Sequence, residues 1–282
     1  MGGLFAVVIM KVFIMAVDAL EYNLVEKWDL KNLKQMTYGK GECFVTREVP
    51  YTPTMWVSFI TGKRPEEHGI DEWHTWGKII DWIRTKTPLA KIKGKNRVIF
   101  PILRLFRIKP KRTLKRSDWE KDFPTIFDLV KPSIPLFIPG YNEPDEFHQY
   151  DETMPMEEVE RIIRENHERR KEIMFEKMKE DWKLFMVWFD ILDLFGHMFW
   201  TLDPEKLKKA YIEMDELVKK VKSKIKGKHI FLIVSDHGMR LSEDGVSGNH
   251  SFHFFWSLNI KMDWKPRYFT DFFPKIIEWS KI

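Results

Sequence analysis

Short apolar runs alternate with longer amphipathic stretches along most of the chain. The clearest apolar runs are Val12–Val17, Pro135–Ile138, Leu184–Phe189 and His229–Val234. Runs of this length without regular polar alternation are typical of strands that are buried on both faces of a parallel sheet. Spread through the chain as they are, these runs predict the strands of one central sheet.

The stretches between the runs carry the signals of helices. Met156–Glu180 contains many pairs of Glu with Lys or Arg four residues apart, which stabilise a helix surface. Asp203–Lys224 opens on an Asp-Pro pair, a cap followed by a proline in the first turn. Thr54–Thr61 is apolar enough for a buried helix and follows a turn at Pro50–Pro53. The alternation predicts an α/β fold, with a mostly parallel central sheet and helices on both faces.

The region from Glu72 to Tyr150 departs from this alternation. Apart from the strand-like Pro135–Ile138, it shows no apolar run of the same kind. No Gly/Ser-rich linker separates it from its flanks. We therefore expect a single domain over residues 1–282, in which residues 72–150 form an inserted cap.

A basic stretch, Lys91–Arg116, lies within this region and has three interpretations. A solvated surface is the first expectation for a run of like charges. Alternatively, the stretch belongs to a cap that attracts an anionic substrate. A third interpretation is contact with an anionic membrane surface, because Ile99–Ile108 mixes apolar residues with arginines as interfacial helices do. The formal net charge of +5 favours anionic ligands but gives no clear indication of a nucleic-acid partner.

Several features bear on the environment of the protein. Leu4–Leu20 is apolar apart from Lys11 and Asp18, but it lacks the preceding positive charge and the cleavage site of a secretory signal. Lys11 also interrupts it as a membrane span. Cys43, the only cysteine, excludes an intrachain disulfide, and we expect a reducing cytoplasm. Charged residues make up 32% of the chain and only two glutamines occur, a composition typical of heat-stable proteins.

Residues that can bind metal ions follow three of the predicted strands. Asp18 follows the first run, Asp193 and His197 follow the third, and Asp236-His237 follows the fourth. The carboxyl ends of parallel strands meet at the edge of the sheet where ligands bind. Carboxylates buried together there are costly unless cations neutralise them. Asp and His ligands without a thiolate suit a catalytic site for zinc, with manganese as the alternative.

Each of these residues also has a purely structural explanation. Asp193 and His197 form an Asp-x-x-x-His pair that arises readily by chance in a chain with 9 histidines. Asp236 is suited to cap a helix, and Asp18 to close a strand in a turn. Taken one at a time, the structural explanation is favoured. Their joint placement after three strands, in this order, favours a metal site.

The order of the motifs resembles the alkaline phosphatase superfamily, in particular its type I phosphodiesterase/nucleotide pyrophosphatase branch. Thr52 stands nine residues before Thr61-Gly62, and Pro65 with His68-Gly69-Ile70 completes the signature around the nucleophile of that branch. Asp193 and His197 match its Asp-x-x-x-His motif. Two later motifs, Ser-Asp-His-Gly-Met and Gly-x-His, are matched by Ser235–Met239 and Gly248–His250. The resemblance covers residues 12 to about 257.

This resemblance implies an alkaline phosphatase-like fold and a two-metal phosphoester hydrolase, a phosphodiesterase or phosphatase that acts on a small phosphoester. One metal ion would be held by Asp193, His197 and His250, and the other by Asp18, Asp236, His237 and the Thr52 oxygen. Thr52 would be the nucleophile, since a metal ion lowers the pKa of its hydroxyl. The resulting phosphothreonine would then be hydrolysed by water. Two ions about 4 Å apart are suited to clamp the attacking and the leaving oxygen.

The sequence also departs from the family pattern. Ala19 stands where the family usually has Gly, and Trp73 stands near the place of an Asn that binds phosphate in nucleotide pyrophosphatases. The Cys/Ser-x-Pro-x-Arg pattern of sulfatases is absent from Thr52–Trp56. Thr54 and His253 compete with Thr52 and His250, although the spacing favours the latter two. For His68 we expect a structural role.

Two further functions stay open. One is a phosphomutase or a phosphonate hydrolase of the same superfamily, although phosphoglycerate mutases of this kind carry Ser at the nucleophile. The other is a non-enzymatic protein that binds an anionic surface on this fold. Such a protein would be expected to have lost ligands, whereas all six metal positions and the nucleophile are occupied here. The sequence does not indicate the oligomeric state.

Overall fold

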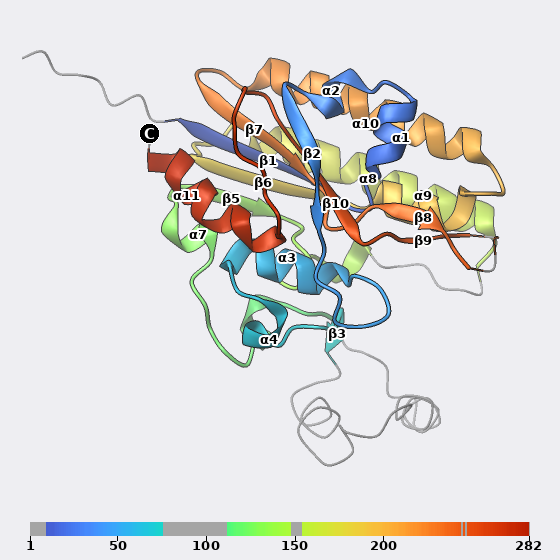
Figure 1. Cartoon of the computed structure of the whole chain (residues 1–282), viewed down its shortest axis with the longest axis horizontal. Helices are drawn as coiled ribbons and strands as arrows, with labels where there is room; N and C mark the ends of the chain where they lie inside the picture. Colours follow the sequence, from blue (N-terminus) through green and yellow to red (C-terminus); the bar gives the residue numbers. More distant parts are fainter. Residues whose placement is uncertain (1–9, 76–111, 148–153, 244, 246, 282) are drawn as a thin grey trace, which may run out of the picture.

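A six-stranded sheet runs through the middle of the molecule, with the strand order β2-β10-β7-β1-β6-β5 (Figure 1). The computed structural model describes residues 10–75, 112–147, 154–243, 245 and 247–281. The strands are β1 (Lys11–Val17), β2 (Thr37–Glu42), β5 (Ser133–Leu136), β6 (Leu184–Phe189), β7 (His229–Val234) and β10 (His253–Leu258). The pairs β7–β1, β1–β6 and β6–β5 are parallel, while β10 is antiparallel to both β7 and β2.

The register of the parallel strands brings their carboxyl ends level with one another. Val17 of β1 lies opposite Phe189 of β6, and Ala16 of β1 lies opposite Val234 of β7. Every residue of β1 from Val12 to Val17 is fully buried, because the strand is paired on both sides and covered on both faces. Whatever residues follow these strands therefore emerge side by side at one edge.

Helices cover both faces of the sheet (Figure 1). On one side lie α1 (Tyr22–Lys27), α2 (Lys31–Lys34), α8 (Met156–Lys177), α9 (Ile191–Phe199) and α10 (Pro204–Lys224). On the other lie α3 (Thr52–Thr61), α4 (Pro65–His68), α7 (Ile126–Leu129) and α11 (Phe272–Lys281). The predicted fold, a mostly parallel sheet between two helical layers, is confirmed.

Smaller elements complete the described part of the chain. Two small two-stranded sheets pair β3 (His74–Thr75) with β4 (Arg112–Thr113), and β8 (Met239–Leu241) with β9 (Gly248–His250). Single 3-10 turns are formed by Arg116–Asp118, Asp145–Phe147 and Phe269–Asp271. Among the described residues, no helix combines the length and the apolar character needed to cross a membrane.

The structure shifts several predicted element boundaries, such as the end of α8 at Lys177 instead of Glu180, and two shifts involve proline. The strand predicted at Pro135–Ile138 is found at Ser133–Leu136, because Phe137 takes a positive φ of 65° that ends it. Its proline is tolerated because β5 is an edge strand. Helix α3 begins at Thr52, two residues before its predicted start, because proline is compatible with the first turn of a helix. Thr52 is thus the first residue of α3, with Tyr51 as its N-cap.

The cap predicted for residues 72–150 is described only at its two ends. At one end β3 pairs with β4, and at the other β5 joins the central sheet. Helix α7 contacts both α3 and α11, so residues 126–136 belong to the main body. Residues 76–111, which include most of the basic stretch 91–116, lie outside the described residues. For them the cap and its three interpretations stay predictions.

Gly62 closes α3 and is tightly packed. It takes the left-handed conformation, with φ of 66°, and a Cβ atom there would lie 2.7 Å from the Phe273 ring of α11. Gly69 ends α4 with a similar φ of 68°, but a Cβ atom there meets no described atom within 4 Å. The two glycines therefore separate the cost of the conformation from the cost of the close approach.

We expect Gly62→Ala to lower the free energy of unfolding more than Gly69→Ala does. Both variants carry the left-handed cost of roughly 1–2 kcal/mol, and only Gly62→Ala adds an overpacking cost of about 1–3 kcal/mol. Equilibrium denaturation of the two variants beside the unmodified protein measures the difference. Equal losses would show that α11 moves away from α3 without cost.

Candidate metal centre

Six metal-binding side chains converge at the carboxyl edge of the sheet. Asp18 follows β1, Asp236 and His237 follow β7, and Asp193 and His197 lie four residues apart on one face of α9. His250 ends β9, which pairs with β8 so that His250 lies opposite Met239. All six were named from the sequence, and the structure brings all six together.

Asp18, Asp236 and His237 form a first cluster that is almost completely shielded from solvent. The Nε2 atom of His237 lies 3.2 Å from Asp18 Oδ1 and 3.5 Å from Asp236 Oδ2. The exposed fractions of Asp18, Asp236 and His237 are 2%, 0% and 0%. Among the described residues, Asp18 Oδ1 and both carboxylate oxygens of Asp236 have no hydrogen-bond partner. Buried carboxylate oxygens without donors are a strong indication of a cation site.

Asp193, His197 and His250 form a second cluster beside the first. The Nε2 atom of His197 lies 3.3 Å from Asp193 Oδ1 and 3.3 Å from the Nε2 atom of His250. The distance from His250 Nε2 to Asp193 Oδ1 is 3.6 Å. Three ligand atoms from a helix and a hairpin thus lie within reach of a single ion.

His237 borders both clusters. Its ring stacks on that of His250, with centroids 3.7 Å apart and planes inclined by 15°. Asp193, His237 and His250 also lie close enough to share an ion, so geometry alone allows a second grouping. We place His237 with Asp18 and Asp236, because its Nε2 atom is within 3.5 Å of both carboxylates.

The backbone fixes the orientation of all three histidine rings. The Nδ1 atoms of His197, His237 and His250 lie 2.9, 3.0 and 2.8 Å from the carbonyl oxygens of Gly248, Gly238 and Pro50. A carbonyl only accepts hydrogen bonds, so each neutral ring carries its proton on Nδ1 and turns the Nε2 lone pair toward the centre. This is the tautomer and the second-layer contact that metal-binding histidines require.

Charge is unevenly distributed between the two clusters. Burial and the nearby Asp236 carboxylate raise the pKa of Asp18 well above its usual range, and burial likewise raises the pKa of Asp236. In the second cluster burial alone would raise the pKa of Asp193, but His197 and His250 outweigh it and lower that pKa. Asp193 in turn raises the pKa of His197 to about 9, against the effect of burial. Ionised carboxylates are therefore unfavourable in the first cluster unless a cation lies beside them.

The predicted nucleophile faces the first cluster. The Thr52 Oγ1 atom lies 3.4 Å from His237 Nε2, and the side chain is buried at the first turn of α3. Thr54, the competing threonine, points elsewhere, since its hydroxyl donates to the Ile70 carbonyl at 2.9 Å. All ten residues of α3 are buried, which holds the helix firmly against its neighbours.

Two other histidines of the predicted motifs lie apart from the clusters. His68 is buried beneath α3, where its Nε2 atom lies 2.9 Å from Ser58 Oγ and its Nδ1 atom accepts from the Ile70 amide. Burial lowers its pKa to about 4, so it is neutral. His253 begins β10 with an exposed side chain. No contact of either residue with the two clusters is found in the described part of the chain.

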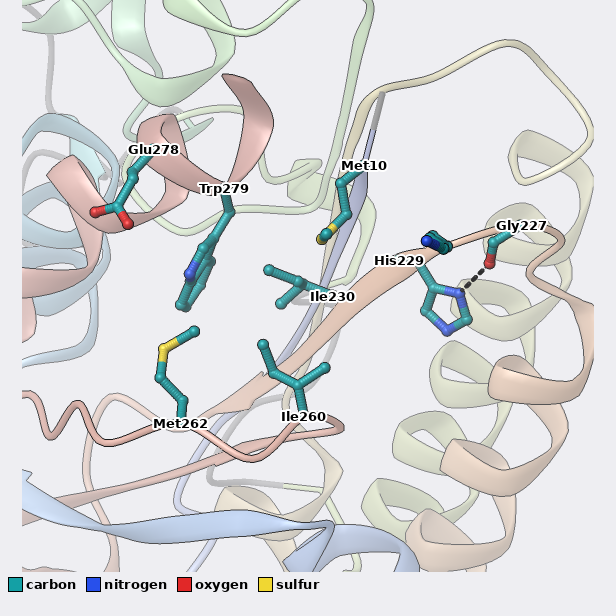
Figure 2. Close-up of a pocket in the computed structure, with 9 residues that line it drawn as sticks. Met10, Gly227, His229, Ile230, Ile260, Met262, Glu278 and Trp279 are labelled. Carbon is teal, nitrogen blue, oxygen red and sulfur yellow. Dashed lines mark hydrogen bonds between the residues drawn. The ribbon is translucent and has the colours of Figure 1, made fainter. Parts of the chain in front are cut away.

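Pockets at the two edges of the sheet differ in character. The larger, about 410 Å³, lies at the opposite edge of the sheet, where Met10, Ile230, Ile260, Met262 and Trp279 point toward one another (Figure 2). The smaller, about 240 Å³, adjoins Asp18 and Asp193 of the two clusters. The first pocket is mainly apolar and adjoins neither ligand cluster, so the second is the candidate substrate pocket.

Some residues that line this second pocket lie outside the motifs identified in the sequence. Asp190 follows β6 directly, is buried, and its Oδ2 atom lies 3.1 Å from Nη2 of the fully buried Arg170. Trp73 and Trp188 also line the pocket, with ring centroids 6.1 Å apart. The strand-end rule that selected Asp18 would have selected Asp190 too, whereas nothing in the sequence pairs Arg170 with it.

A mostly parallel α/β sheet that gathers Asp and His side chains at its carboxyl edge defines a protein with the alkaline phosphatase-like fold. The model of the type I phosphodiesterase / nucleotide pyrophosphatase family matches residues 12–265, and the chain belongs to this family. The family recognised from the motifs is thereby confirmed. Its members are phosphoester hydrolases of a metal-dependent type.

The solved structures that resemble this chain have low sequence identity to it. Murine ectonucleotide pyrophosphatase/phosphodiesterase 5 is 15% identical, with a TM-score of 0.48, over 83% of this chain and 59% of its own. The human protein of the same name is 16% identical, with a TM-score of 0.47 and the same coverage. This chain thus spans less than two thirds of their length. No curated protein matches the chain significantly.

We expect Asp236→Asn to stabilise the metal-free protein at pH 8, by roughly 1–3 kcal/mol in the free energy of unfolding. The folded pKa of Asp236 is raised above 3.8, so protonation favours the native state at low pH and this contribution is lost as pH rises through the folded pKa. The advantage of Asn should therefore shrink toward pH 4. Denaturation in chelator at both pH values measures it.

Asp215→Asn provides the matched control. Asp215 is also buried, but its two oxygens accept hydrogen bonds from Asn32 Nδ2 and the Leu33 amide at 2.6 and 2.9 Å. The same change should destabilise the protein there, because an amide nitrogen would face a donor. A loss of stability in both variants would contradict a carboxylate cluster that is built for cations.

Proposed function

We propose that the protein is a phosphodiesterase or phosphatase that uses two divalent metal ions and Thr52 as its nucleophile. The observation that carries this proposal is the pair of adjoining ligand clusters, with the buried Thr52 hydroxyl 3.4 Å from the His237 ring that borders both. Membership of the phosphodiesterase family supports the reaction class.

The residues present are suited to the ions. The first cluster supplies carboxylate oxygens that have no other described partner, and three imidazoles turn their Nε2 atoms inward. One ion would be held by Asp193, His197 and His250, and the other by Asp18, Asp236, His237 and the Thr52 oxygen. When bound, the ions would neutralise the carboxylates, acidify the threonine hydroxyl and stabilise charge on the phosphoryl oxygens. Zinc remains the expected metal and manganese the alternative, from the ligand types alone.

Thr52 would attack the phosphorus atom and displace the alcohol of the substrate. The bond from Thr52 Oγ1 to phosphorus forms as the bond to the leaving oxygen breaks, and the hydroxyl proton ends on the departing alcohol. A monoester would leave a phosphothreonine, and a diester would leave its remaining ester group on the phosphorylated threonine. Water then hydrolyses this ester and restores the hydroxyl. The amino end of α3 favours a phosphoryl group beside Thr52, since backbone N–H groups and the helix dipole attract anions there.

The leaving group would occupy the pocket of about 240 Å³ beside Asp18 and Asp193. Trp73 and Trp188 offer aromatic surface on its wall. A phosphomutase or phosphonate hydrolase would share the metal ligands, so a substrate screen separates these functions. A protein that only binds an anionic surface would show no turnover at all.

We expect hydrolysis to depend on bound metal. The metal-free protein should be inactive toward phosphomonoesters, phosphodiesters and sulfate esters, and zinc or manganese should restore activity toward a phosphoester. Elemental analysis should find close to two ions per chain. Activity that is indifferent to chelator in a protein without bound metal would refute the proposal.

The ligand assignment has its own control within the same assay. His197→Ala should lose metal and activity, whereas His68→Ala should keep both and lose stability instead, because His68 bonds Ser58 beneath α3. Equal losses of metal in the two variants would mean that the ligands were assigned wrongly.

We expect Thr52→Ala to abolish turnover, on the order of 10⁶-fold, while the protein still folds and binds metal. Thr52→Ser should keep partial activity, because the hydroxyl survives and only the methyl that restricts its rotamer is lost. Thr54→Ala is the neighbouring control and should stay active. Trapping of phosphate on the chain and steady-state rates together measure the effect. Full activity in Thr52→Ala would show that no threonine intermediate forms.

A further inference from the structure

Glu21 lies three residues after Asp18 and belongs to neither ligand cluster. Its side chain is buried, and its two carboxylate oxygens face different parts of the chain. Oε1 accepts hydrogen bonds from the backbone and side-chain amides of Asn23, at 3.0 and 2.7 Å. Oε2 accepts from the backbone amide of Met239 at 3.0 Å and from the hydroxyl of Ser251 at 3.3 Å.

These contacts join the three segments that carry four of the six proposed ligands, namely Asp18, Asp236, His237 and His250. Glu21 itself follows Asp18, Met239 stands two residues after His237, and Ser251 follows His250. Gly238 permits the approach, because a Cβ atom there would lie only 2.1 Å from Glu21 Oε2. A backbone bond of 2.9 Å from Ser251 to Gly238 closes the arrangement.

The backbone of Glu21 is fixed as well. Its amide donates to the Tyr211 hydroxyl at 3.0 Å, and that hydroxyl donates to the Ala19 carbonyl at 3.2 Å. Tyr211 is a buried residue of α10, so the loop after β1 is held by the helical layer. Ala19 needs this support, since its φ of 53° lies in the left-handed region that residues with a side chain seldom adopt.

We propose that Glu21 is a positioning residue that holds the loops after β1, β7 and β9 in the arrangement that binds metal. The inference rests on the proposed two-metal function. A buried carboxylate accepts all four donors at once, and such charge-assisted hydrogen bonds are stronger than neutral ones. A glutamine of the same shape turns an amide nitrogen toward one pair of donors, which breaks the link on that side. Outer-layer contacts of this kind typically change metal affinity 10–100-fold.

The test is calorimetric titration of the metal-free full chain with Zn²⁺. We expect Glu21→Gln to weaken at least one of the two binding steps by about 10–100-fold. Asp215→Asn is the matched control, a buried carboxylate that also bonds an Asn side chain and a backbone amide, but between α10 and α2. Its zinc affinity should stay within about threefold of the unmodified value, because the change touches no ligand loop.

The outcomes separate the inference from the function on which it rests. If Glu21→Gln binds zinc as tightly as the unmodified chain, the positioning role is overturned but the proposed function is not. The same holds if Asp215→Asn weakens zinc binding as much as Glu21→Gln does. If Glu21→Gln does not fold, Ser251→Ala removes only the hydroxyl contact and should still weaken zinc binding; an unchanged affinity there overturns the inference. An unmodified chain that binds no zinc would overturn the proposed function, and the positioning role with it.

Discussion

The rest of the structure depends on the gathering of two carboxylates, those of Asp18 and Asp236, in a nearly water-free space. The strands β1 and β7 bring the two together, and the burial and repulsion of their charges oppose folding. The fold tolerates this because its central strands are among its best-packed elements. Burial on both faces of β1 and parallel pairing on both sides fix where the acidic residues emerge. The hydrophobic core thus supplies the free energy that holds an otherwise unfavourable polar arrangement in place.

Backbone groups do much of the orienting in this centre. Carbonyls of Pro50, Gly238 and Gly248 hold the imidazoles, and the start of α3 holds the threonine. Gly248 can approach α9 only because it lacks a side chain, since a Cβ atom there would lie 2.4 Å from the Gly196 carbonyl oxygen. The glycines in these motifs therefore matter for the distance between backbones as much as for conformation. That is why the short motifs around the ligands contain residues with no chemistry of their own.

Much of the fold and of the candidate site could be predicted from local sequence. Buried parallel strands are continuous apolar runs, so β6 and β7 were predicted at their observed bounds and the acidic residues after them followed. Strand β2, Thr37–Glu42, was not predicted, because its two glycines and a lysine give it no apolar pattern. The roles of Arg170 and Glu21 could not be predicted from the sequence for another reason. Their partners lie far apart in the chain, and a single sequence contains no signal for such tertiary hydrogen bonds.

The antiparallel direction of β10 determines where this fold can accept insertions. Because β10 alone runs antiparallel, it enters the sheet at the carboxyl edge, and the chain from β7 returns to it without crossing the molecule. Val234 and Trp256, which are paired neighbours, bracket an excursion that contains Asp236, His237 and His250. Lengthening such an excursion costs little closure entropy and leaves the strand pairing untouched. Insertions between His237 and His250 can therefore change the entrance to the site while the strand order of the sheet is kept.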